Sequence, residues 1–440
     1  MINLFRKYAD VLFPLLIFSP GLRGLGLIYY ALLSIAIFFS SPLILKTYRK
    51  IFNSKFSLIL IIFYLITLLG LIPSFHEIPP IYLMQSIFRI ILFIFLIFYV
   101  NGCKEQNSYS LKVVKIYLFI SFLASAIIFL QYTTGAIDIF SEDFSTRAGL
   151  PRYSTLSGST NIFSVSVAFS ILISTFCYQK VKLINTNLKL FLYQTFILLA
   201  AIANLSRSGL IASLIAFLFS RVYLLFVKVN PNFASEFYKI NFKYKFNKLK
   251  IPFINLSVFS LIGVILLSQY KILLRFTKTA IFFVTGNKAL ISSYENATFE
   301  NTSIIGDLLY RFQWFSKEFF TSLIYHPQNL LFGGGSKYFG GTIGLPRPYA
   351  HNMLIDIFQA QGIFGLMFIL FLFIILFLNS TNSSINKIKP SLDLRSISIT
   401  SLFLMLCTHN SGIFFHPLTI FPLLFIQDFI NKKDFVKLNI

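Results

Sequence analysis

The chain has 440 residues, of which 56% are apolar, only 12% are charged and 55 are Phe. Soluble domains carry about 25% charged residues. This composition therefore excludes a soluble globular enzyme, a disordered chain, a collagen and a small disulfide scaffold, and it indicates a polytopic helical membrane protein. The net charge of +23 suits either nucleic acid or a membrane surface as a partner, so the placement of the basic residues decides between them.

Cysteine usage and the N-terminal residues give no sign of a metal site or a cleaved leader. Cys103, Cys177 and Cys407 are far apart, and the sequence has no CxxC or Cys/His metal spacing. We expect buried thiols, with neither a metal nor a cofactor. Arg6 and Lys7 precede a short apolar run that lacks a small-residue cleavage pattern. This run is therefore predicted to be the first membrane segment.

Apolar stretches recur along the chain, and a membrane-spanning helix needs about 20 mostly apolar residues. The stretches cover roughly 8–20, 24–45, 56–75, 80–100, 114–134, 161–178, 189–205, 208–228, 252–270, 352–379, 396–409 and 415–430. The first is short and contains or adjoins Pro14, Pro20 and Gly21, so it is the least typical. The stretch 352–379 exceeds one span, and its first turns are expected in the interface. The prediction is an all-α polytopic integral membrane protein, one domain over 1–440, with about 12 transmembrane helices.

The distribution of Lys and Arg predicts the orientation of these spans. With both termini on one side, that side carries about twice as many basic residues as the other, which makes it cytoplasmic by the positive-inside rule. The segment 228–251 then forms a basic cytoplasmic loop. Its aromatic and Lys residues alternate beside a membrane, which favours anionic lipid head groups over nucleic acid as the partner.

Two segments on the opposite, outer side are predicted to be loops, at 135–160 and at 271–351. The second is the longest polar region, and loops of that length usually carry function or are disordered. It contains Trp314 and the cluster GGGSKYFGG, which lacks the strand and the GK[ST] ending of a nucleotide-binding P-loop. Residues 307–324 have apolar positions at helical spacing. They predict either an amphipathic helix on the outer face or an ordinary packed loop helix.

Arginine is the most suggestive residue type in the outer segments. These arginines are Arg147, Arg152, Arg207, Arg275, Arg311 and Arg347. Guanidinium groups bind phosphate through bidentate hydrogen bonds. Arg207 lies in LSRSG, a turn between two apolar stretches at the membrane boundary, where it can meet the head group of a lipid substrate. The alternative for a single arginine is contact with ordinary lipid phosphates, so convergence of several arginines decides between the two interpretations.

His351 begins the run HNMLIDIFQAQGIFGL, where the large outer loop re-enters the membrane. Imidazole suits a general base near neutral pH, although a His at a helix start is more often a cap or a packing residue. Asn352 is a candidate for orienting a substrate or for capping the helix. Asp356 shares a helical face with His351 only loosely. Gly362 and Gly365 are expected to permit close helix contact.

The last outer turn contains His409, Asn410, Ser411 and His416. These side chains either line the same cavity as His351 or form a polar loop between the last two spans, and the polar loop is the favoured interpretation. Few acids lie inside the predicted spans, which disfavours a proton-coupled carboxylate relay.

In this order, the motifs resemble the O-antigen ligase/O-antigen polymerase superfamily, which are bacterial membrane glycosyltransferases of the GT-C type. The matching segments are RAGLPRYSTLSGSTNIFSVSVAF with Asn161 at a helix start, LSRSGLIA with Arg207, RFQWFSKEFFTSLIYHPQNLLFGGG from Arg311, and HNMLIDIFQAQGIFG with His351. Members often carry an acid two residues before the first motif glycine, where this chain has Ala360. A role for that acid is therefore not carried over, although Asp356 fills another commonly acidic position.

The resemblance implies a donor glycan on undecaprenyl diphosphate. A sugar hydroxyl of the acceptor attacks the anomeric carbon and the lipid diphosphate leaves, so no nucleotide sugar is needed. Charge grows on the departing diphosphate, and preorganised arginines stabilise it. The resemblance implies catalytic roles for His351, Arg207 and Arg311. It implies substrate-binding roles for Arg147, Arg152, Asn161, Tyr310, Trp314, Asn352 and Asp356.

Polymerase and ligase share this chemistry and differ in acceptor, which is another lipid-linked repeat unit for the polymerase and the lipid A core for the ligase. The Phe- and Ile-rich composition and the departure at Ala360 favour a polymerase of surface polysaccharide in lipopolysaccharide biosynthesis. We expect it in the bacterial inner membrane, with cytoplasmic termini, a periplasmic active site and a chain-length regulator as a candidate partner. A ligase is the first alternative. A lipid-linked oligosaccharide flippase or another transporter is the second, although no repeated halves are visible.

Overall fold

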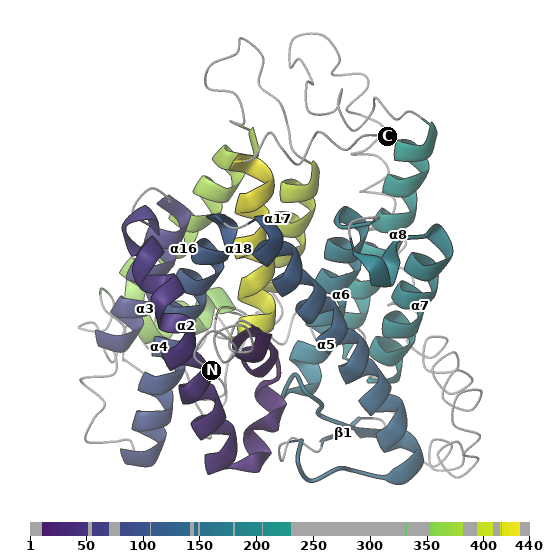
Figure 1. The fold of residues 1–440 in the computed structure, drawn as a ribbon, viewed down its shortest axis with the longest axis horizontal. Helices are drawn as coiled ribbons and strands as arrows, with labels where there is room; N and C mark the ends of the chain where they lie inside the picture. Colours follow the sequence, from purple (N-terminus) through teal and green to yellow (C-terminus); the bar gives the residue numbers. More distant parts are fainter. Residues whose placement is uncertain are drawn as a thin grey trace. The chain divides into compact units, whose positions relative to one another are not determined.

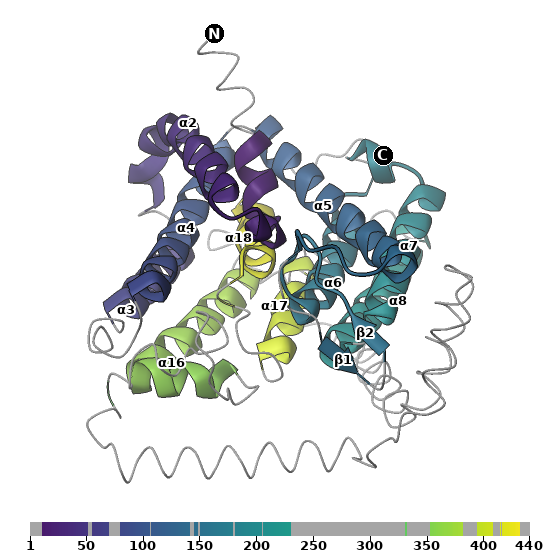
Figure 2. The ribbon, with the colours of Figure 1, turned by 90° about the horizontal axis from the view of Figure 1, so that it is seen from below.

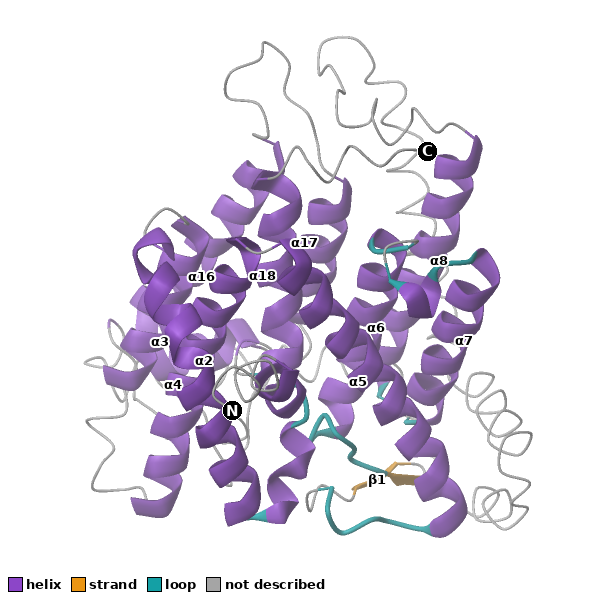
Figure 3. Cartoon of the chain, in the orientation of Figure 1, coloured by secondary structure: helices purple, strands orange, loops and turns teal. Residues whose placement is uncertain are grey.

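The computed structural model describes residues 11–51, 55–69, 80–105, 107–140, 145–147, 150–178, 181–204, 206–229, 331, 353–381, 394–407, 414 and 416–431. Within these residues the chain is almost entirely helical (Figure 3). A short antiparallel hairpin joins β1 (Ser145–Arg147) to β2 (Leu150–Arg152), with Thr146 opposite Pro151. The all-α prediction is confirmed for the described part of the chain, apart from this hairpin.

The chain divides into two compact units. Unit 1 comprises Met1–Pro42, Gln106–Asn301 and Asn439–Ile440, and unit 2 comprises Leu43–Glu105 and Thr302–Leu438. Helix α2 (Leu27–Ile51) has residues in both.

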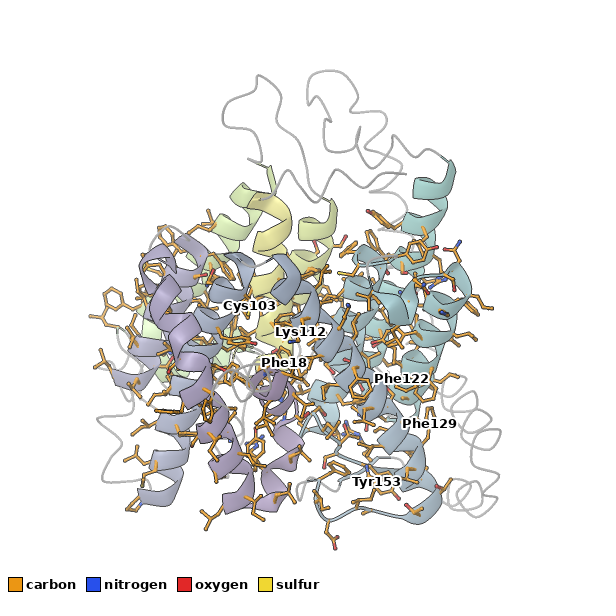
Figure 4. The ribbon with its side chains drawn as sticks, in the orientation of Figure 1. Phe18, Cys103, Lys112, Phe122, Phe129 and Tyr153 are labelled. Atoms are coloured by element: carbon orange, nitrogen blue, oxygen red, sulfur yellow. The ribbon has the colours of Figure 1, made fainter. Side chains whose placement is uncertain are left out.

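The helices described in unit 1 include four that pack together: α5 (Asn107–Thr134), α6 (Thr160–Phe176), α7 (Asn187–Ala203) and α8 (Arg207–Val229). Figures 1 and 2 show them side by side, and α6 contacts the other three. Nearly every residue of α6 is buried, so it is the central helix. The rings of Phe122 and Phe129 on α5, labelled in Figure 4, lie 4.9 and 5.3 Å from the ring of Phe196 on α7.

Small residues bring α6 and α8 close together. Gly209, Ala212, Ser213 and Ala216 follow one another at helical spacing on α8 and are all buried. A Cβ atom on Gly209 would lie 2.3 Å from the Cβ of Ser164 on α6. The Ser213 hydroxyl donates to the Ser164 carbonyl at 3.0 Å. Small residues at this spacing let helices approach closely within membranes, and here they fix the beginning of α8 against the beginning of α6.

The helices described in unit 2 are α3 (Lys55–Leu69), α4 (Pro80–Glu105), α16 (Met353–Thr381), α17 (Leu394–Cys407) and α18 (Pro417–Asn431). α16 packs against α3 and α17, and α4 packs against α3 and α18. Aromatic rings fill the space between them. Phe403 meets Phe414 edge-on at 4.8 Å, and Tyr64 stacks on Phe93 at 5.2 Å.

α16 is interrupted rather than continuous. Gly362 has φ 66° and ψ −159°. Glycine adopts this backbone conformation at little cost, whereas a residue with a side chain would be strained in it. Gly365 leaves room for a side chain of its own helix, because a Cβ there would lie 2.4 Å from the Cβ of Gln361. Close contact between helices at these two glycines, which the sequence predicts, stays a prediction. Gly362 breaks the helix, and Gly365 accommodates Gln361.

Every predicted apolar stretch that falls in the described residues coincides with a helix, while 252–270 lies outside them. Residues 11–17 are helical within the short first stretch. The helices often continue past the apolar stretch: α4 runs to Glu105 and α2 to Ile51. The extension of α2 is polar and contains neither Gly nor Pro, so no residue in it stops the helix.

By length and composition, one described helix is long and apolar enough to cross a membrane, at Leu111–Thr134 within α5. Shorter apolar helices are Leu27–Ser41, Phe56–Leu69, Ile87–Cys103, Thr160–Phe176, Asn187–Ala203, Gly209–Leu224 and Gln361–Ile375. Large apolar side chains are exposed on several of these helices, among them Leu27 (86% exposed) and Phe38 (72% exposed). Polar side chains such as Ser170 and Gln194 are instead buried between them. The described helices thus expose apolar surface and enclose hydroxyl and amide groups.

Candidate functional site

One end of unit 1 gathers segments that the sequence predicts on the outer side. The 3₁₀ helix η1 (Pro20–Leu25) contacts the predicted 135–160 loop. The N–H of Gly21 donates to the Leu156 carbonyl at 2.8 Å, and the backbone of Gly24 lies so close to the same loop that a Cβ would clash. Residues 20–25, which lie between the first two predicted spans, therefore pack directly on the 135–160 loop.

The described part of the 135–160 loop is held from within. The side chain of Gln131, near the end of α5, donates to the Ser154 carbonyl at 2.9 Å and accepts from the N–H of Ile137 at 3.2 Å. The Ser154 hydroxyl donates to the Phe140 carbonyl at 2.9 Å. Gln131 thus links both limbs of the loop, and residues 152–158 are buried. The segment is an ordered closure over the helix ends.

Tyr153 lies inside this closure (Figure 4). Its ring meets Tyr132 of α5 edge-on at 5.0 Å, and the Tyr132 hydroxyl donates to the Ala203 carbonyl at the end of α7 at 2.6 Å. Burial raises the pKa of Tyr153 above its ordinary value, so its phenol stays protonated at physiological pH. The two tyrosines connect the loop to the C-terminal end of α7.

Arg152, at the end of β2, is 8% exposed and is fixed by two neutral oxygens. Its Nε donates to the backbone carbonyl of Asn204 at 3.0 Å, and its Nη2 donates to Asn161 Oδ1 at 2.8 Å. Asn161 Oδ1 also accepts from the Ser206 hydroxyl at 3.3 Å. With two donors on its oxygen, the Asn161 amide has one orientation, in which Nδ2 is the remaining donor.

Asn204 ties the same network to α6. It follows the last residue of α7 and is fully buried. Its Nδ2 donates to the Thr160 carbonyl and to Ser164 Oγ, the latter at 3.3 Å. Its Oδ1 is buried and has no hydrogen-bond partner among the described residues. Burying such an acceptor without a partner costs about 1–3 kcal/mol, which is unusual in a region as well hydrogen-bonded as this one.

Arg207 is the first residue of α8 and directly follows this network. The carbonyl of Ser206 accepts the N–H of Leu210 at 2.8 Å and so begins the helix, while the Ser206 side chain bonds to Asn161. The backbone of Arg207 is therefore positioned by the same residues that orient Arg152. Its side chain is outside the described part of the structure.

The helices at this end carry no acidic residue. The sequence from 151 to 230, which covers α6, α7 and α8, contains no Asp or Glu, while Asp138 lies in the loop that closes over their ends. The Asn204 carbonyl and Asn161 Oδ1, which accept hydrogen bonds from Arg152, are themselves neutral. A cation that is taken out of water without an opposite charge is costly. An end of the bundle that carries Arg152 and Arg207 is thus chemically suited to an anionic group such as a phosphate.

The predicted site residues have different outcomes. Arg152 and Asn161 are brought together by a direct hydrogen bond. Arg147 pairs with Leu150 in the hairpin, and Asp356 lies on α16 in unit 2; the side chains of Arg147 and Asp356 are not described. Five predicted residues lie outside the described residues, namely His351, Asn352, Tyr310, Arg311 and Trp314. Arg152 and Ser206, the residue before Arg207, share the acceptor Asn161 Oδ1, and convergence of the outer arginines on one cavity stays a prediction.

Sequence reasoning missed Asn204, Ser206 and Tyr153. Asn204 stands directly before LSRSG, and Ser206 belongs to that motif. The available signal was a polar residue at the junction of two apolar stretches, where helix ends need partners for free backbone groups. Tyr153 lies inside the quoted segment RAGLPRYSTLSG and gave no signal of its own.

His416 has a structural role. Its carbonyl accepts the N–H of Ile420 at 3.1 Å, and its Nδ1 accepts the N–H of Leu418 at 3.3 Å, at the beginning of α18. It is buried and acts as an N-cap of that helix. The favoured interpretation of a polar turn between helices is therefore supported at this residue, while His409, Asn410 and Ser411 lie outside the described residues.

Comparison with known proteins adds no relative. No family model matches the chain, and neither a curated protein nor a solved structure matches it. The likeness to the O-antigen ligase/O-antigen polymerase superfamily therefore rests on the motif residues themselves.

Proposed function

We propose that the chain is a multi-pass membrane glycosyltransferase of the O-antigen polymerase kind, in the bacterial inner membrane with its termini cytoplasmic. Apolar side chains cover the described helices, while Ser, Thr and Gln are buried between them, which is the distribution expected of helices in lipid. A helix needs about 20 residues to cross a hydrocarbon core about 30 Å thick, and the apolar parts of most of these helices are shorter. Several of them extend through less apolar ends to 23 residues or more, as in α8.

The observation that carries the proposal is the network around Arg152, Asn161, Asn204 and Ser206. It joins two segments of the sequence that resemble separate motifs of the superfamily. Asn204 and Thr160, for example, are hydrogen-bonded although they are more than 40 positions apart. It also joins a buried arginine to the beginning of the helix that carries Arg207, in a stretch of sequence without acids. Arginine is the residue type that binds phosphate through paired hydrogen bonds, so this arrangement supports a site for a diphosphate.

In the proposed reaction, the donor is a glycan on undecaprenyl diphosphate at the periplasmic face. An oxygen of an acceptor sugar hydroxyl, on another lipid-linked repeat unit, bonds to the anomeric carbon of the donor glycan. The bond from that carbon to the diphosphate oxygen breaks, and undecaprenyl diphosphate leaves with the electron pair. The hydroxyl proton passes to a base, for which His351 is the candidate.

The arginines have distinct proposed roles. Arg207 and Arg311 stabilise the charge that grows on the leaving diphosphate, which is usually the largest contribution of an enzyme to such a step. Arg147 contacts the diphosphate or the glycan. Arg152 is mostly buried, so it acts by adding positive charge and by orienting Asn161 toward the substrate. Outside the described residues, Asn352 orients the acceptor, and Tyr310 and Trp314 stack on sugar rings. Asp356 remains a substrate-binding candidate on α16.

The direct test is polymerisation of a purified lipid-linked repeat unit by reconstituted protein. Arg207→Ala and His351→Ala should each lower the rate of chain growth about 100- to 1,000-fold, the usual loss for one group that stabilises a transition state. Lys189→Ala is the matched control, since Lys189 is exposed at the other end of the bundle. Long-chain product at the normal rate from either well-folded variant would contradict the proposed roles.

A transporter is the second candidate, because α16 is broken at Gly362 and buries Gln361 there. Interrupted helices often form the substrate sites of transporters. Chain growth by the purified protein without an ion gradient excludes a purely transporting role. A ligase shares the proposed site, and the acceptor separates the two: loss of the gene leaves single-repeat product for a polymerase and unattached long chains for a ligase.

A further inference from the structure

Arg221 is a second arginine with an unusual environment, at the opposite end of the α6–α8 bundle. It lies on α8, partly buried, with the centre of its guanidinium group 5.2 Å from the ring of Phe191 on α7 and 4.9 Å from the ring of Phe217. A cation over two aromatic faces gains electrostatic attraction from both rings. The rings also restrict the directions in which the guanidinium can turn.

The acceptor available to Arg221 inside the protein is already shared. Its Nη2 donates to Gln194 Oε1, which also accepts from the Ser220 hydroxyl at 3.1 Å. The other end of the Gln194 amide is occupied, because Nε2 donates to Ser174 Oγ and Thr175 Oγ1, each at 2.9 Å. Gln194 is neutral, so it fixes the position of Arg221 without balancing its charge. The Nε of Arg221 is buried and has no acceptor among the described residues.

The helices α6, α7 and α8 offer this arginine no counter-charge. No Asp or Glu occurs from 151 to 230. The sequence that flanks these helix ends is basic instead, with Lys180, Lys182, Lys189 and Lys228. An uncompensated cation at the edge of an apolar region is expensive, and such residues usually mark a functional contact. The missing anion must therefore come from outside these helices.

The depth of Arg221 matches a lipid head group. The fourteen residues from Arg207 to Arg221 add about 21 Å along α8. If α8 begins at one boundary of a hydrocarbon core about 30 Å thick, Arg221 lies about 9 Å from the other boundary, within reach for a long side chain that extends toward the head groups. Phe191 lies one turn after the beginning of α7, which is consistent with the same boundary.

The surface beside Arg221 is apolar. On α7, Leu188 is 67% exposed and Leu192 is 56% exposed, on either side of the half-exposed Phe191. Acyl chains fit such a surface, and a phosphate fits the guanidinium above it. An ammonium or choline head group would meet Lys189 and the other basic residues, so a head group with net negative charge is favoured.

We propose that Arg221, held between Phe191 and Phe217, binds the phosphate of an anionic phospholipid in the cytoplasmic leaflet. The guanidinium donates to the phosphate oxygens, and the acyl chains lie along Leu188 and Leu192. This inference rests on the membrane placement in the proposed function, but it does not depend on glycosyl transfer.

The test is native mass spectrometry of the purified full chain, titrated with phosphatidylglycerol, phosphatidylcholine, undecaprenyl phosphate or inorganic phosphate. Wild type should retain phosphatidylglycerol at least tenfold more tightly than phosphatidylcholine. Arg221→Gln should remove that preference. Arg23→Gln, which loses one charge in η1 at the other end of unit 1, should leave it unchanged. Arg221→Lys should bind several-fold more weakly than wild type, because an ammonium lacks the planar fork of donors.

Several results would overturn the site. Equal retention of phosphatidylglycerol by wild type and Arg221→Gln would do so, as would an equal loss in Arg23→Gln. Displacement of phosphatidylglycerol by stoichiometric undecaprenyl phosphate, or by inorganic phosphate, would show a different occupant. If Arg221→Gln yields no monodisperse protein, unchanged affinity in Arg221→Lys counts against the site. Extraction of the chain from cells by carbonate without detergent would instead contradict the membrane placement itself.

Discussion

The two ends of the α6–α8 bundle hold arginine in contrasting ways. Arg152 is fixed by a backbone carbonyl and by the partly buried amide of Asn161, which bonds in turn to Ser206 at the beginning of α8. Arg221 is held by side chains, between two aromatic rings and against Gln194. Arg152 takes part in the hydrogen bonds that link the end of α7 to the beginning of α8. Arg221 lies against side chains of helices that other contacts also hold together.

This difference separates two uses of the same residue type. A change at Arg152 should propagate to Asn161 and to the turn that precedes Arg207, because they share acceptors and donors. A change at Arg221 should stay local, since Ser220, Ser174 and Thr175 still satisfy Gln194. If the comparison holds, catalysis is sensitive to the first end and lipid affinity is sensitive to the second.

Of the changes that test this comparison between Arg152 and Arg221, Arg152→Ala is expected to have the largest effect. The substitution removes a positive charge and the side-chain donor of the Asn204 carbonyl, and the loss of a partner costs about 1–3 kcal/mol for a buried group. Asn161 Oδ1 keeps the Ser206 hydroxyl as its donor. We expect the rate of polymerisation to fall about 100-fold, measured with purified lipid-linked repeat units and with protein shown to be monodisperse. Asn161→Ala should lower the rate less, because it retains the charge of Arg152.

Arg152→Lys is the matched control for charge. A lysine keeps the positive charge but cannot donate to both oxygens with a planar fork. Its rate should lie between those of wild type and Arg152→Ala, with the change mainly in kcat if orientation matters and mainly in KM if charge alone attracts the donor. A folded Arg152→Ala protein with the wild-type rate would break the contrast between the two ends.

The next effect is on stability, from Gly209→Val. A Cβ at Gly209 would lie 2.3 Å from the Cβ of Ser164 and 3.0 Å from its backbone carbon. The helices must separate to admit it, and overpacking of this kind costs about 1–3 kcal/mol and occasionally more. Thermal unfolding in detergent should show a lower midpoint. Ile211→Val, a partly exposed position two residues further along α8, should cost no more than about 1 kcal/mol.

Gly209→Val also sharpens the comparison. The added side chain acts at the beginning of α8, near Ser206 and Arg207, while Arg221 lies about three turns further along the helix. Folded Gly209→Val protein should therefore lose polymerisation but keep its preference for phosphatidylglycerol. Loss of both properties together would show that the bundle responds as one body.

A smaller effect on catalysis is expected from Arg221→Gln. The glutamine keeps a donor for Gln194 and removes the charge, so chain growth should change less than twofold in a fixed lipid mixture, while the affinity for phosphatidylglycerol falls about tenfold. The same reconstituted samples serve both measurements. A loss of chain growth comparable to that of Arg152→Ala would contradict the assignment of separate roles.

The sequence predicted the helices of unit 1 well, because α5 to α8 are apolar and are separated by more polar segments, of which 135–160 is the longest. It did not predict how their ends are joined. The bonds from Arg152 to Asn204 and from Asn204 to Thr160 link positions about 40 to 50 apart in the chain. Such partners depend on how far each helix extends and how it is rotated, which an apolar pattern with little periodicity does not specify.

The break in α16 shows a second limit. The sequence FQAQGIFG contains glycines that suit close packing as well as an interruption. The choice depends on Gln361, whose side chain lies over Gly365 and donates to Thr67 on α3. That contact joins residues far apart in sequence. Conversely, the pairing of Arg152 with Asn161 was within reach, since both belong to one short motif.

The smallest effect concerns Tyr153 and appears only at high pH. Burial raises the pKa of its phenol in the folded state, while the unfolded chain has a value of about 10. The stabilisation is therefore fully present below the unfolded pKa and is lost as pH rises through the folded one. Tyr153→Phe cannot lose this proton, so its melting temperature should fall less steeply than that of wild type above pH 10. The other tyrosines titrate in both proteins, so the difference between the two melting temperatures at each pH reports on Tyr153. Equal slopes of melting temperature against pH would show that the 135–160 loop opens locally before Tyr153 loses its proton.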